Sequence, residues 1–354
     1  FTAPVNITLS ATASDADGSV AKVEFYRGTA LIATDSNAND GWSIVWSAVP
    51  QGSYAISAKA IDNSGAATVS NVSNITVAPA NSVSVVIASP QDNAVIADDA
   101  VLVKGTFSGP SNTGITVNGV IASTAGTTFA VEVPLQLGSN ILTVTATAPN
   151  GAKITKTMTV TSSGAAVIST TASPATGIAP LKVSFSTINP AGKTIQRIDV
   201  DFDNNGTIDA TSLDPRAAIT HTFDSRGIYP VKFIVSHSEG TESQTVLVSV
   251  LDSGQMDQTF RAIWDGMNSA LVAKNKVQAL RYLNSQAQAK YGPLIDTLMP
   301  YFPTMVASYS TLQRLSLSGN VGEYAVNRMV GGQNRIFLIY FVLDTDGVWR
   351  LDSM

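Results

Sequence analysis

The chain has 354 residues, a formal net charge of −5, no cysteine and only 13% charged residues. The missing cysteine excludes disulfides, thiol chemistry and cysteine-based metal sites, and the charge balance offers no basic stripe to nucleic acid. Because 44% of the residues are hydrophobic, the chain can bury packed cores and is not a disordered polypeptide. Ser, Thr, Ala, Asn and Gly replace charged residues, a composition that suits strands and turns outside the cytoplasm.

No apolar run reaches the roughly 18 residues that suggest a membrane span, so none is predicted. No signal peptide is recognisable, and Phe1 falls within a strand-like pattern. The chain is therefore expected to be a mature or trimmed part of a longer precursor.

In the first 79 residues, apolar and polar residues alternate in short runs separated by Gly, Asn and Asp turns. Such alternation is the period of a half-buried strand. The runs lie at 5–11, 23–26, 42–46, 54–60 and 72–77. Several short strands joined by turns predict an antiparallel β-sandwich over residues 1–79.

Two further β-sandwiches are predicted, over 80–164 and 165–252. Asn118-Gly119 is the turn of a two-residue hairpin. The three segments share a short internal repeat. In each, a Gly-x-Tyr or Gly-x-Asn triplet, ending at Tyr54, Asn140 or Tyr229, precedes a strand. A tyrosine there can form a corner by bonding back to the preceding turn, so corners are expected at Tyr54 and Tyr229 but not at Asn140.

Short junctions, rich in proline or small residues, separate the segments at 78–81, 162–164 and 252–254. Such short links leave little slack, so the modules are expected to form a semi-rigid rod.

The last hundred residues differ from the rest in being helix-rich. A helix over about 255–273 carries an apolar face at helical spacing, made by Phe260, Ile263, Trp264, Met267 and Leu271. Further helical segments are predicted at 276–284 and from Tyr291, and strands at 312–318, 322–330, 335–343 and 348–352, with hairpin turns at 331–332 and 346–347. This order predicts one α+β domain over 253–354.

The strand around Tyr340 is apolar on both faces over 336–342. Such a strand is expected to be central and covered on each side, by the helices and by a partner protein.

Several motifs resemble known families. Residues 1–78 resemble a bacterial immunoglobulin-like domain through Ser14–Val20, Val23–Tyr26 and Ala60–Asn63. Residues 165–252 resemble a PKD domain, carried by Ser173-Pro174, 177–181, 199–203, 221–223 and 227–229, with Val200 in place of the usual tryptophan. The C-terminal order and the ending 346–351 resemble the NTF2-like, cystatin-type cone, and the whole order resembles non-repeat regions of bacterial YD-repeat surface proteins.

The resulting fold class is mainly β, with three tandem Ig-like/PKD β-sandwiches followed by a C-terminal α+β NTF2-like domain. The resemblance implies extracellular spacers and adhesion modules, often attached to surface proteins or to polysaccharide-degrading enzymes. The NTF2-like family contains enzymes, binding domains and dimerisation domains, so it fixes no function.

The sharpest candidate site is an acidic loop that begins at Asp201. Oxygen-bearing residues alternate along it around Gly206, as in the first part of an EF-hand-type calcium loop. The predicted calcium ligands are Asp201, Asp203, Asn205, Thr207 and Asp209. Ser212 stands where that loop has its last carboxylate, and Asp214 is the candidate substitute. The alternative is a plain acidic turn between two strands.

Weaker candidates lie elsewhere. Asp15, Asp17 and Asp62 could share a cation, but turn residues bonding their own backbone are the better interpretation. His221 and His237 are too few for a histidine cluster or a catalytic triad. Trp42 and Trp46 are expected to pack in a core rather than to form a sugar-binding platform. An acid–base pair in the C-terminal domain would come from five residues, for which strand pairing is the better interpretation: Glu323, Tyr324, Arg328, Arg335 and Tyr340.

The sequence therefore predicts a non-catalytic, secreted or cell-surface bacterial protein with a structural or adhesion role. Its β modules would form a stalk for a C-terminal binding or assembly domain. Expected partners are another protein, or a second copy in a dimer or fibre, through the C-terminal domain or sheet edges. Two alternatives stay open, a small-ligand-binding or enzymatic C-terminal domain and a carbohydrate-binding accessory region.

Overall fold

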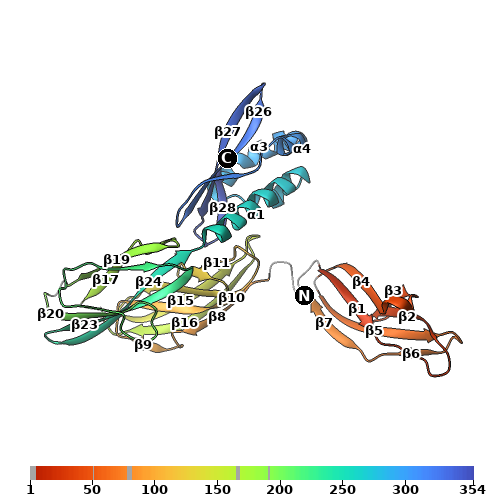
Figure 1. The fold of residues 1–354 in the computed structure, drawn as a ribbon, viewed down its shortest axis with the longest axis horizontal. Coiled ribbons are helices and arrows are strands. Elements are labelled where there is room, and N and C mark those ends of the chain that lie inside the picture. Colours follow the sequence, from red (N-terminus) through yellow and green to blue (C-terminus); the bar gives the residue numbers. More distant parts are fainter. Residues whose placement is uncertain (1–4, 51, 78–81, 165–167, 190–191) are drawn as a thin grey trace. The chain divides into compact units, whose positions relative to one another are not determined.

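The structure is a computed structural model that describes residues 5–50, 52–77, 82–164, 168–189 and 192–354. It is mainly β, with many sheets, and a short C-terminal helical region is followed by strands (Figure 1). The chain divides into two compact units, Phe1–Ser82 and Val83–Met354. The predicted junction at 78–81 lies outside the described residues.

The first unit consists of two sheets. One is the pair β1–β4, and the other has the order β3-β2-β5-β6, with β7 also pairing with β5. The strands are β1 (Val5–Ala11), β2 (Val20–Arg27), β3 (Ala30–Asp35), β4 (Trp42–Val49), β5 (Gly52–Asp62), β6 (Ala67–Val69) and β7 (Ser73–Val77), with a short helix at Ala38–Asp40. Trp42 is buried in one core cluster and Trp46 packs against the other, as predicted.

The second unit begins with a β region at 83–164. Its sheets have the orders β13-β14-β10-β8 and β12-β11-β15-β16-β9, and both contribute to one apolar core. The strands are β8 (Ser84–Ser89), β9 (Ala94–Ile96), β10 (Ala100–Ser108), β11 (Gly114–Val117), β12 (Val120–Ile121), β13 (Ser123–Ala125), β14 (Thr128–Pro134), β15 (Gly138–Thr147) and β16 (Lys153–Ser162). The predicted hairpin is confirmed, since Asn118 and Gly119 have φ of 50° and 83°, as a type I′ turn requires.

A further β region follows at 168–251, with a core of its own. Its sheets have the orders β17-β19-β22 and β18-β24-β23-β20-β21. The strands are β17 (Ser169–Ser173), β18 (Thr176–Ile178), β19 (Leu181–Ile188), β20 (Ile195–Asp201), β21 (Ala210–Ser212), β22 (Ile219–Phe223), β23 (Gly227–His237) and β24 (Gly240–Leu251).

Both predicted tyrosine corners are confirmed, and a third residue takes the equivalent position. The hydroxyls of Tyr54 and Tyr229 donate to the carbonyl four residues earlier at 2.7 and 2.9 Å. Asn140 was expected to break this pattern, but its amide donates to the carbonyl four residues earlier at 2.7 Å. An asparagine therefore closes the same turn with a shorter side chain.

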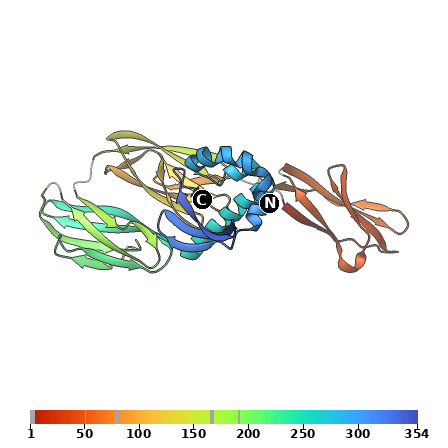
Figure 2. The same cartoon turned by 90° about the horizontal axis from the view of Figure 1, so that it is seen from above.

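The C-terminal region packs helices on one face of an antiparallel meander in the order β25-β26-β27-β28 (Figures 1 and 2). The elements are α1 (Ser253–Val272), α2 (Lys276–Leu280), α3 (Ser285–Leu298), the short 3-10 turn η2 (Met299–Tyr301), α4 (Phe302–Ala307), β25 (Gln313–Leu317), β26 (Val321–Val330), β27 (Gln333–Leu343) and β28 (Trp349–Ser353). The predicted apolar face of α1 is buried throughout. None of the helices in the described ranges is both long and apolar enough to cross a membrane.

Three local predictions in this region are wrong. The second helix was predicted to run to residue 284 but ends at Leu280, and its Val277 is 67% exposed. The third helix begins at Ser285, because the side chain of Asn284 accepts from the N–H of Ala287 at 2.8 Å and caps it ahead of the predicted start.

The third error concerns β27, which lies between two strands as predicted but was expected to be covered by the helices along its whole length, whereas coverage by a partner stays a prediction. Its residues Gln333–Leu338 are all exposed, because the helices cover only the other half of the sheet.

The expected linker at 252–254 is instead a helix cap. β24 ends at Leu251, and the side chain of Asp252 accepts from the N–H of Gln255 at 2.7 Å to begin α1. Leu251 and Ile178 pack against the core of the C-terminal region, so the sheet of the preceding β region and the helices are joined without slack.

The 83–164 region contacts the C-terminal region through the segment before β11. The amide of Asn112 donates to the carbonyl of Trp349 at 2.9 Å and accepts from the N–H of Trp349 at 2.8 Å. A Cβ on Gly114 would lie 2.3 Å from the carbonyl oxygen of Asp346, so the two backbones meet where only glycine fits. Residues 83–354 therefore form one compact unit, in which the three regions keep separate cores.

A buried ion cluster supports this contact from inside the C-terminal region. Both terminal nitrogens of Arg350 donate to Asp346, at 2.7 and 2.8 Å, and one also donates to Asp344 at 2.7 Å. Burial raises the pKa of Asp346, but the Arg350 guanidinium outweighs burial and holds that pKa below its usual range. The cluster fixes the 344–348 turn that Gly114 contacts.

The contact at Gly114 predicts the effect of one added methyl group. Gly114→Ala should separate the two regions, because its Cβ would meet three backbone atoms of residues 346–348 within 2.7 Å, and backbone cannot rotate away. In limited proteolysis of the full chain, the variant should then be cut faster than the wild type in the segment that separates residues 83–164 from residues 253–354.

Gly292→Ala is the matched control, since the nearest atom to its added Cβ, on Leu280, is 3.8 Å away. That variant should resist proteolysis like the wild type, because alanine favours a helix interior by about 0.5–1 kcal/mol. Equal cleavage of both variants would contradict the close backbone contact.

Candidate functional site

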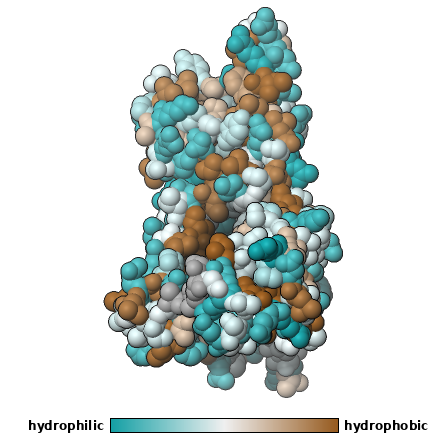
Figure 3. Space-filling model, turned by 90° about the vertical axis from the view of Figure 1, so that its left-hand side faces the viewer, coloured by the Kyte–Doolittle hydropathy of each residue, from teal (hydrophilic) through white to brown (hydrophobic). Residues whose placement is uncertain are grey.

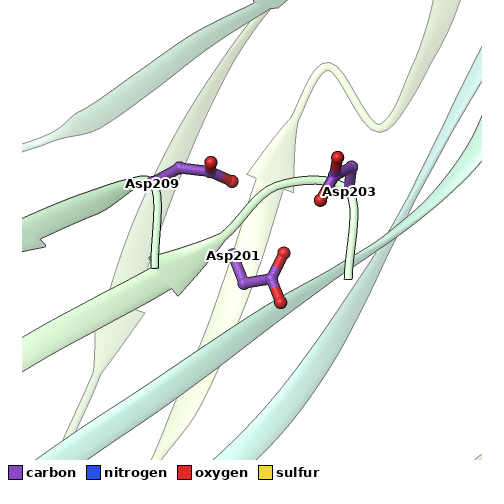
Figure 4. Close-up of side chains that lie close together, drawn as sticks. All are labelled: Asp201, Asp203 and Asp209. Carbon is purple, nitrogen blue, oxygen red and sulfur yellow. The ribbon is translucent and has the colours of Figure 1, made fainter. Parts of the chain in front are cut away.

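The acidic loop predicted to bind calcium connects β20 to β21. Asp201 is the last residue of β20, Asp203 lies in the loop and Asp209 precedes β21 (Figure 4). One carboxylate oxygen from each of the three lies within 4.8 Å of the others. The turn depends on left-handed backbone at Asn204 and Gly206, with φ of 57° and 92°.

Hydrogen bonds from the loop backbone hold Asp201 in place. Its two oxygens accept from the N–H groups of Asn205 and Gly206 at 3.1 and 2.7 Å. Burial raises the pKa of Asp201, but these backbone donors outweigh burial and hold the pKa below its usual range. Asp201 therefore stays ionised at neutral pH despite its 2% exposure.

The remaining predicted ligands are used within the loop. Asn205 donates its amide to Asp203 at 2.9 Å and accepts from the N–H of Thr207 at 2.7 Å, and Asp209 accepts from the N–H of Phe202 at 2.7 Å. Asp214, the candidate substitute for the missing last ligand, is not among the carboxylates that gather.

The gathered charge favours a cation. Throughout the described ranges, no lysine or arginine pairs with any of the three aspartates, and like charges this close repel one another. Hard cations such as calcium prefer carboxylate oxygens. Three of the five predicted ligands, Asp201, Asp203 and Asp209, gather as a calcium site needs, and calcium binding stays a prediction.

The other histidine and acidic candidates have structural contacts. His221 stacks on Phe202 with ring centroids 4.0 Å apart. His237 is buried, and its Nε2 lies 3.3 Å from Glu242. In the first unit, Asp62 accepts from the backbone N–H groups of Ser64 and Ala66 at 2.7 and 2.9 Å. This is the turn role that the sequence favoured over a cation site.

The five acid–base candidates of the C-terminal region do not meet at one site. Tyr324 points into the core, where its hydroxyl donates to Asp257 at 2.7 Å. Neighbouring residues of a strand face opposite sides, so Glu323 lies on the other face, where it accepts from the hydroxyl of Tyr340 at 3.1 Å. Arg328 lies over the ring of Tyr309, 5.9 Å from its centroid.

Sequence reasoning missed Asp257, the half-buried partner of Tyr324. Asp257 also accepts from Nε of Arg261 at 2.8 Å, and burial together with the bond to Asp257 raises the pKa of Tyr324 above its usual range. The spacing of Asp257 and Arg261, four residues apart on one helix, was the available signal.

Aromatic rings fill the interior between α1 and the sheet. Phe260 stacks on Phe341 at 4.7 Å and meets the edge of Trp349 at 4.9 Å, while Tyr324 meets Phe341 at 5.4 Å. A Cβ on Gly322 would lie 2.4 Å from the ring of Phe260. The helix and the sheet therefore meet through packed rings.

A half-open cleft of about 700 Å³ lies where the three regions of the second unit meet. Its walls combine neutral polar side chains such as Asn112, Gln255 and Asn320 with the charged residues Arg226 and Asp252 and the ring of Trp349. The sequence could not predict this cleft, because it exists only through the contact between regions.

Two family matches cover separate parts of the chain. Residues 1–58 match the family "Bacterial Ig domain" and residues 84–163 match "Glucodextranase, domain B". No relative was found among curated proteins. The first match and the repeated two-sheet regions together support a multi-module bacterial β protein.

Solved structures show only distant likeness. The fibronectin(III)-like modules of Clostridium thermocellum CbhA are 22% identical, with 46% of this chain and 89% of that chain covered and a TM-score of 0.24. Bacteroides ovatus SGBP-B, solved with a mixed-linkage heptasaccharide, is 16% identical, with 70% of this chain and 65% of that chain covered and a TM-score of 0.18. Dimeric latent PorU of Porphyromonas gingivalis is 12% identical, with 71% of this chain and 32% of that chain covered and a TM-score of 0.26. Likenesses of this size show neither a shared arrangement of modules nor a shared ligand.

The acidic loop predicts a calcium-dependent gain in stability. Calcium at about 100 times its dissociation constant should add about 2.7 kcal/mol to the free energy of unfolding of the full chain. Asp209→Asn should remove that gain, because the substitution replaces one of the three gathered carboxylates. Thermal unfolding with calcium and with excess chelator measures the difference.

Asp214→Asn provides the control, since Asp214 lies outside the carboxylate group and its loss should leave the calcium effect unchanged. A calcium effect that survives Asp209→Asn, or none in the wild type, would identify the loop as a plain acidic turn.

Proposed function

We propose that the chain is a non-catalytic, extracellular structural or adhesion protein of the bacterial cell surface. Its Ig-like and PKD-like β regions act as a scaffold, and its C-terminal region acts as an NTF2-like binding or assembly domain. The low charge, the missing cysteine and the match of residues 1–58 to a bacterial Ig family support an extracellular setting. The order of modules resembles non-repeat regions of YD-repeat surface proteins.

The packed interior of the C-terminal region carries the non-catalytic part of the proposal. A small-ligand or catalytic site in such a domain needs a concave pocket with converging polar groups. Here Phe260 is fully buried among Tyr324, Phe341 and Trp349. The hydrogen-bonded pair of Glu323 and Tyr340 lies on the face of the sheet opposite to Tyr324. Binding through the outer surface is the role that this arrangement favours.

A single truncation tests the packed interior. Phe260→Ala should lower the free energy of unfolding by about 3–5 kcal/mol, the cost of deleting a fully buried ring. Tyr301→Ala, an aromatic residue that is 63% exposed, should change it by less than about 0.5 kcal/mol. Urea unfolding of the full chain, followed by far-UV circular dichroism, gives both values.

The same variants should differ in ligand binding. Phe260→Ala should gain stabilisation by benzene, which enters dry apolar cavities, whereas the wild type should not. A cost below about 1 kcal/mol for Phe260→Ala, or wild-type stabilisation by benzene, would mean that the ring borders an open pocket and that the ligand-binding alternative is correct.

Carbohydrate binding is the second candidate, favoured by the cleft between the regions and by the match to the family "Glucodextranase, domain B". Neutral amide and hydroxyl side chains suit an uncharged sugar with many hydroxyls. Soluble glucans in a native gel should then retard the wild type, and Gln255→Ala with Asn320→Ala should abolish the retardation. Gln313→Ala, outside the cleft, is the control. Equal migration with and without glucan would remove this candidate.

A further inference from the structure

The far half of the β26–β27 hairpin has an open edge. β27 pairs with β26 along its whole length, from Gln333 to Val342, but β28 pairs only with Tyr340–Leu343. Within 253–354, all of which the structure describes, residues 333–339 have no backbone partner on the β28 side. An unpaired edge of this kind is a template for another strand.

The direction of the neighbouring bonds shows which residues face that edge. The N–H of Leu343 donates toward β26, to Asn320, and that of Asp344 donates toward the β28 side, to Val348. Bonding direction alternates along an antiparallel strand. The backbone N–H and C=O groups of Asn334, Ile336 and Leu338 therefore point to the open side.

The side chains of this segment are also unusually apolar and exposed. Ile336 is 69% exposed, Leu338 43% and Met329, on the paired strand, 60%. In Figure 3 the uppermost projection is the end of this hairpin, with brown apolar surface below its teal tip. Residues that expose both apolar side chains and unpaired backbone favour a β-strand as the occupant.

The charges of the segment favour a second copy of the same chain. Arg335 is its only charged residue between Gln333 and Ile339. The three edge residues are symmetric about Ile336, so a copy placed by a twofold axis at Ile336 pairs Ile336 with itself and Asn334 with Leu338. In that register Arg335 lies opposite the partner's Phe337, which avoids a like-charge pair and allows a cation–π contact.

We propose that two copies of this chain pair antiparallel through the β27 edge, with Ile336 on the twofold axis, to form one continuous sheet. This dimer rests on the assembly role proposed for the C-terminal region, and it identifies the partner as a second copy of the chain. The contact is isologous, so it closes as a dimer. One paired strand is smaller than the roughly 800 Å² per partner of a standard stable interface, so the dimer should dissociate on dilution.

Cysteine cross-linking tests the register, because the chain has no cysteine of its own. Opposite residues of a hydrogen-bonded pair have Cα atoms about 5.5 Å apart, within disulfide range. Ile336→Cys should therefore form a covalent dimer of the full chain on mild oxidation. At about 10 µM chain, an effective thiol concentration of about 1 mM should accelerate this about 100-fold over random collision.

Two controls separate the register from general reactivity. Asn334→Cys should cross-link slowly, because four residues of stagger place the two thiols about 14 Å apart along the strands. Ile141→Cys should also be slow, since Ile141 is a strand isoleucine with similar exposure, 65%, in another region. Equal cross-linking of the three variants would overturn the proposal.

Sedimentation of cysteine-free protein gives an independent measurement. The wild type should show a concentration-dependent dimer, which Ile336→Lys should abolish by placing like charges opposite each other, whereas Ile141→Lys should not. A monomer at every concentration would overturn the proposal. The same result is expected if the edge is occupied by a strand of another protein instead of a second copy. The Phe260→Ala measurement does not depend on dimerisation, so failure here would leave the packed interior as it stands.

Discussion

The close approach of two backbones at Gly114 is the constraint on which the second unit depends. Because no side chain separates Gly114 from the 346–348 turn, the carbonyl and N–H of Trp349 come within reach of Asn112. Arg350 holds the same turn from the other side through two aspartates. The cleft between the regions is a consequence of this contact and of the direct passage of β24 into α1.

Local patterns in the sequence predicted much of the fold. Period-two alternation located most strands, and the helical spacing of Phe260, Ile263 and Trp264 identified the buried face of α1, since both patterns report which side of an element is apolar. Gly331-Gly332 and Asn118-Gly119 predicted their hairpins because few other residues adopt positive φ.

Features that depend on long-range contacts were not predictable in the same way. Asn112 and Gly114 look like ordinary turn residues until Trp349 and Gly347 lie against them. β27 reads as a covered strand from its composition, but the helices stop short of residues 333–338. The acidic loop was found by its spacing, whereas the bonds that Asn205 makes within the loop depend on its folded conformation.

The two halves of the C-terminal sheet have different roles in this account. The half near the helices is closed by aromatic packing around Phe260 and joined to the β regions, so it supplies a fixed base. The other half projects as a hairpin with one open edge, available to a strand. A rigid base and an exposed strand edge suit a surface protein that assembles through its C-terminal region.

The central claim is that residues 83–354 form one compact unit whose regions are held together, and a distance distribution tests it most directly. Spin labels on Ile141→Cys in β15 and Leu294→Cys in α3, both exposed residues, report on the 83–164 and C-terminal regions of the same molecule. Double electron–electron resonance, with labelled chain diluted into unlabelled chain, should give a single narrow distance. A broad distribution would show that the regions move independently and would contradict the account.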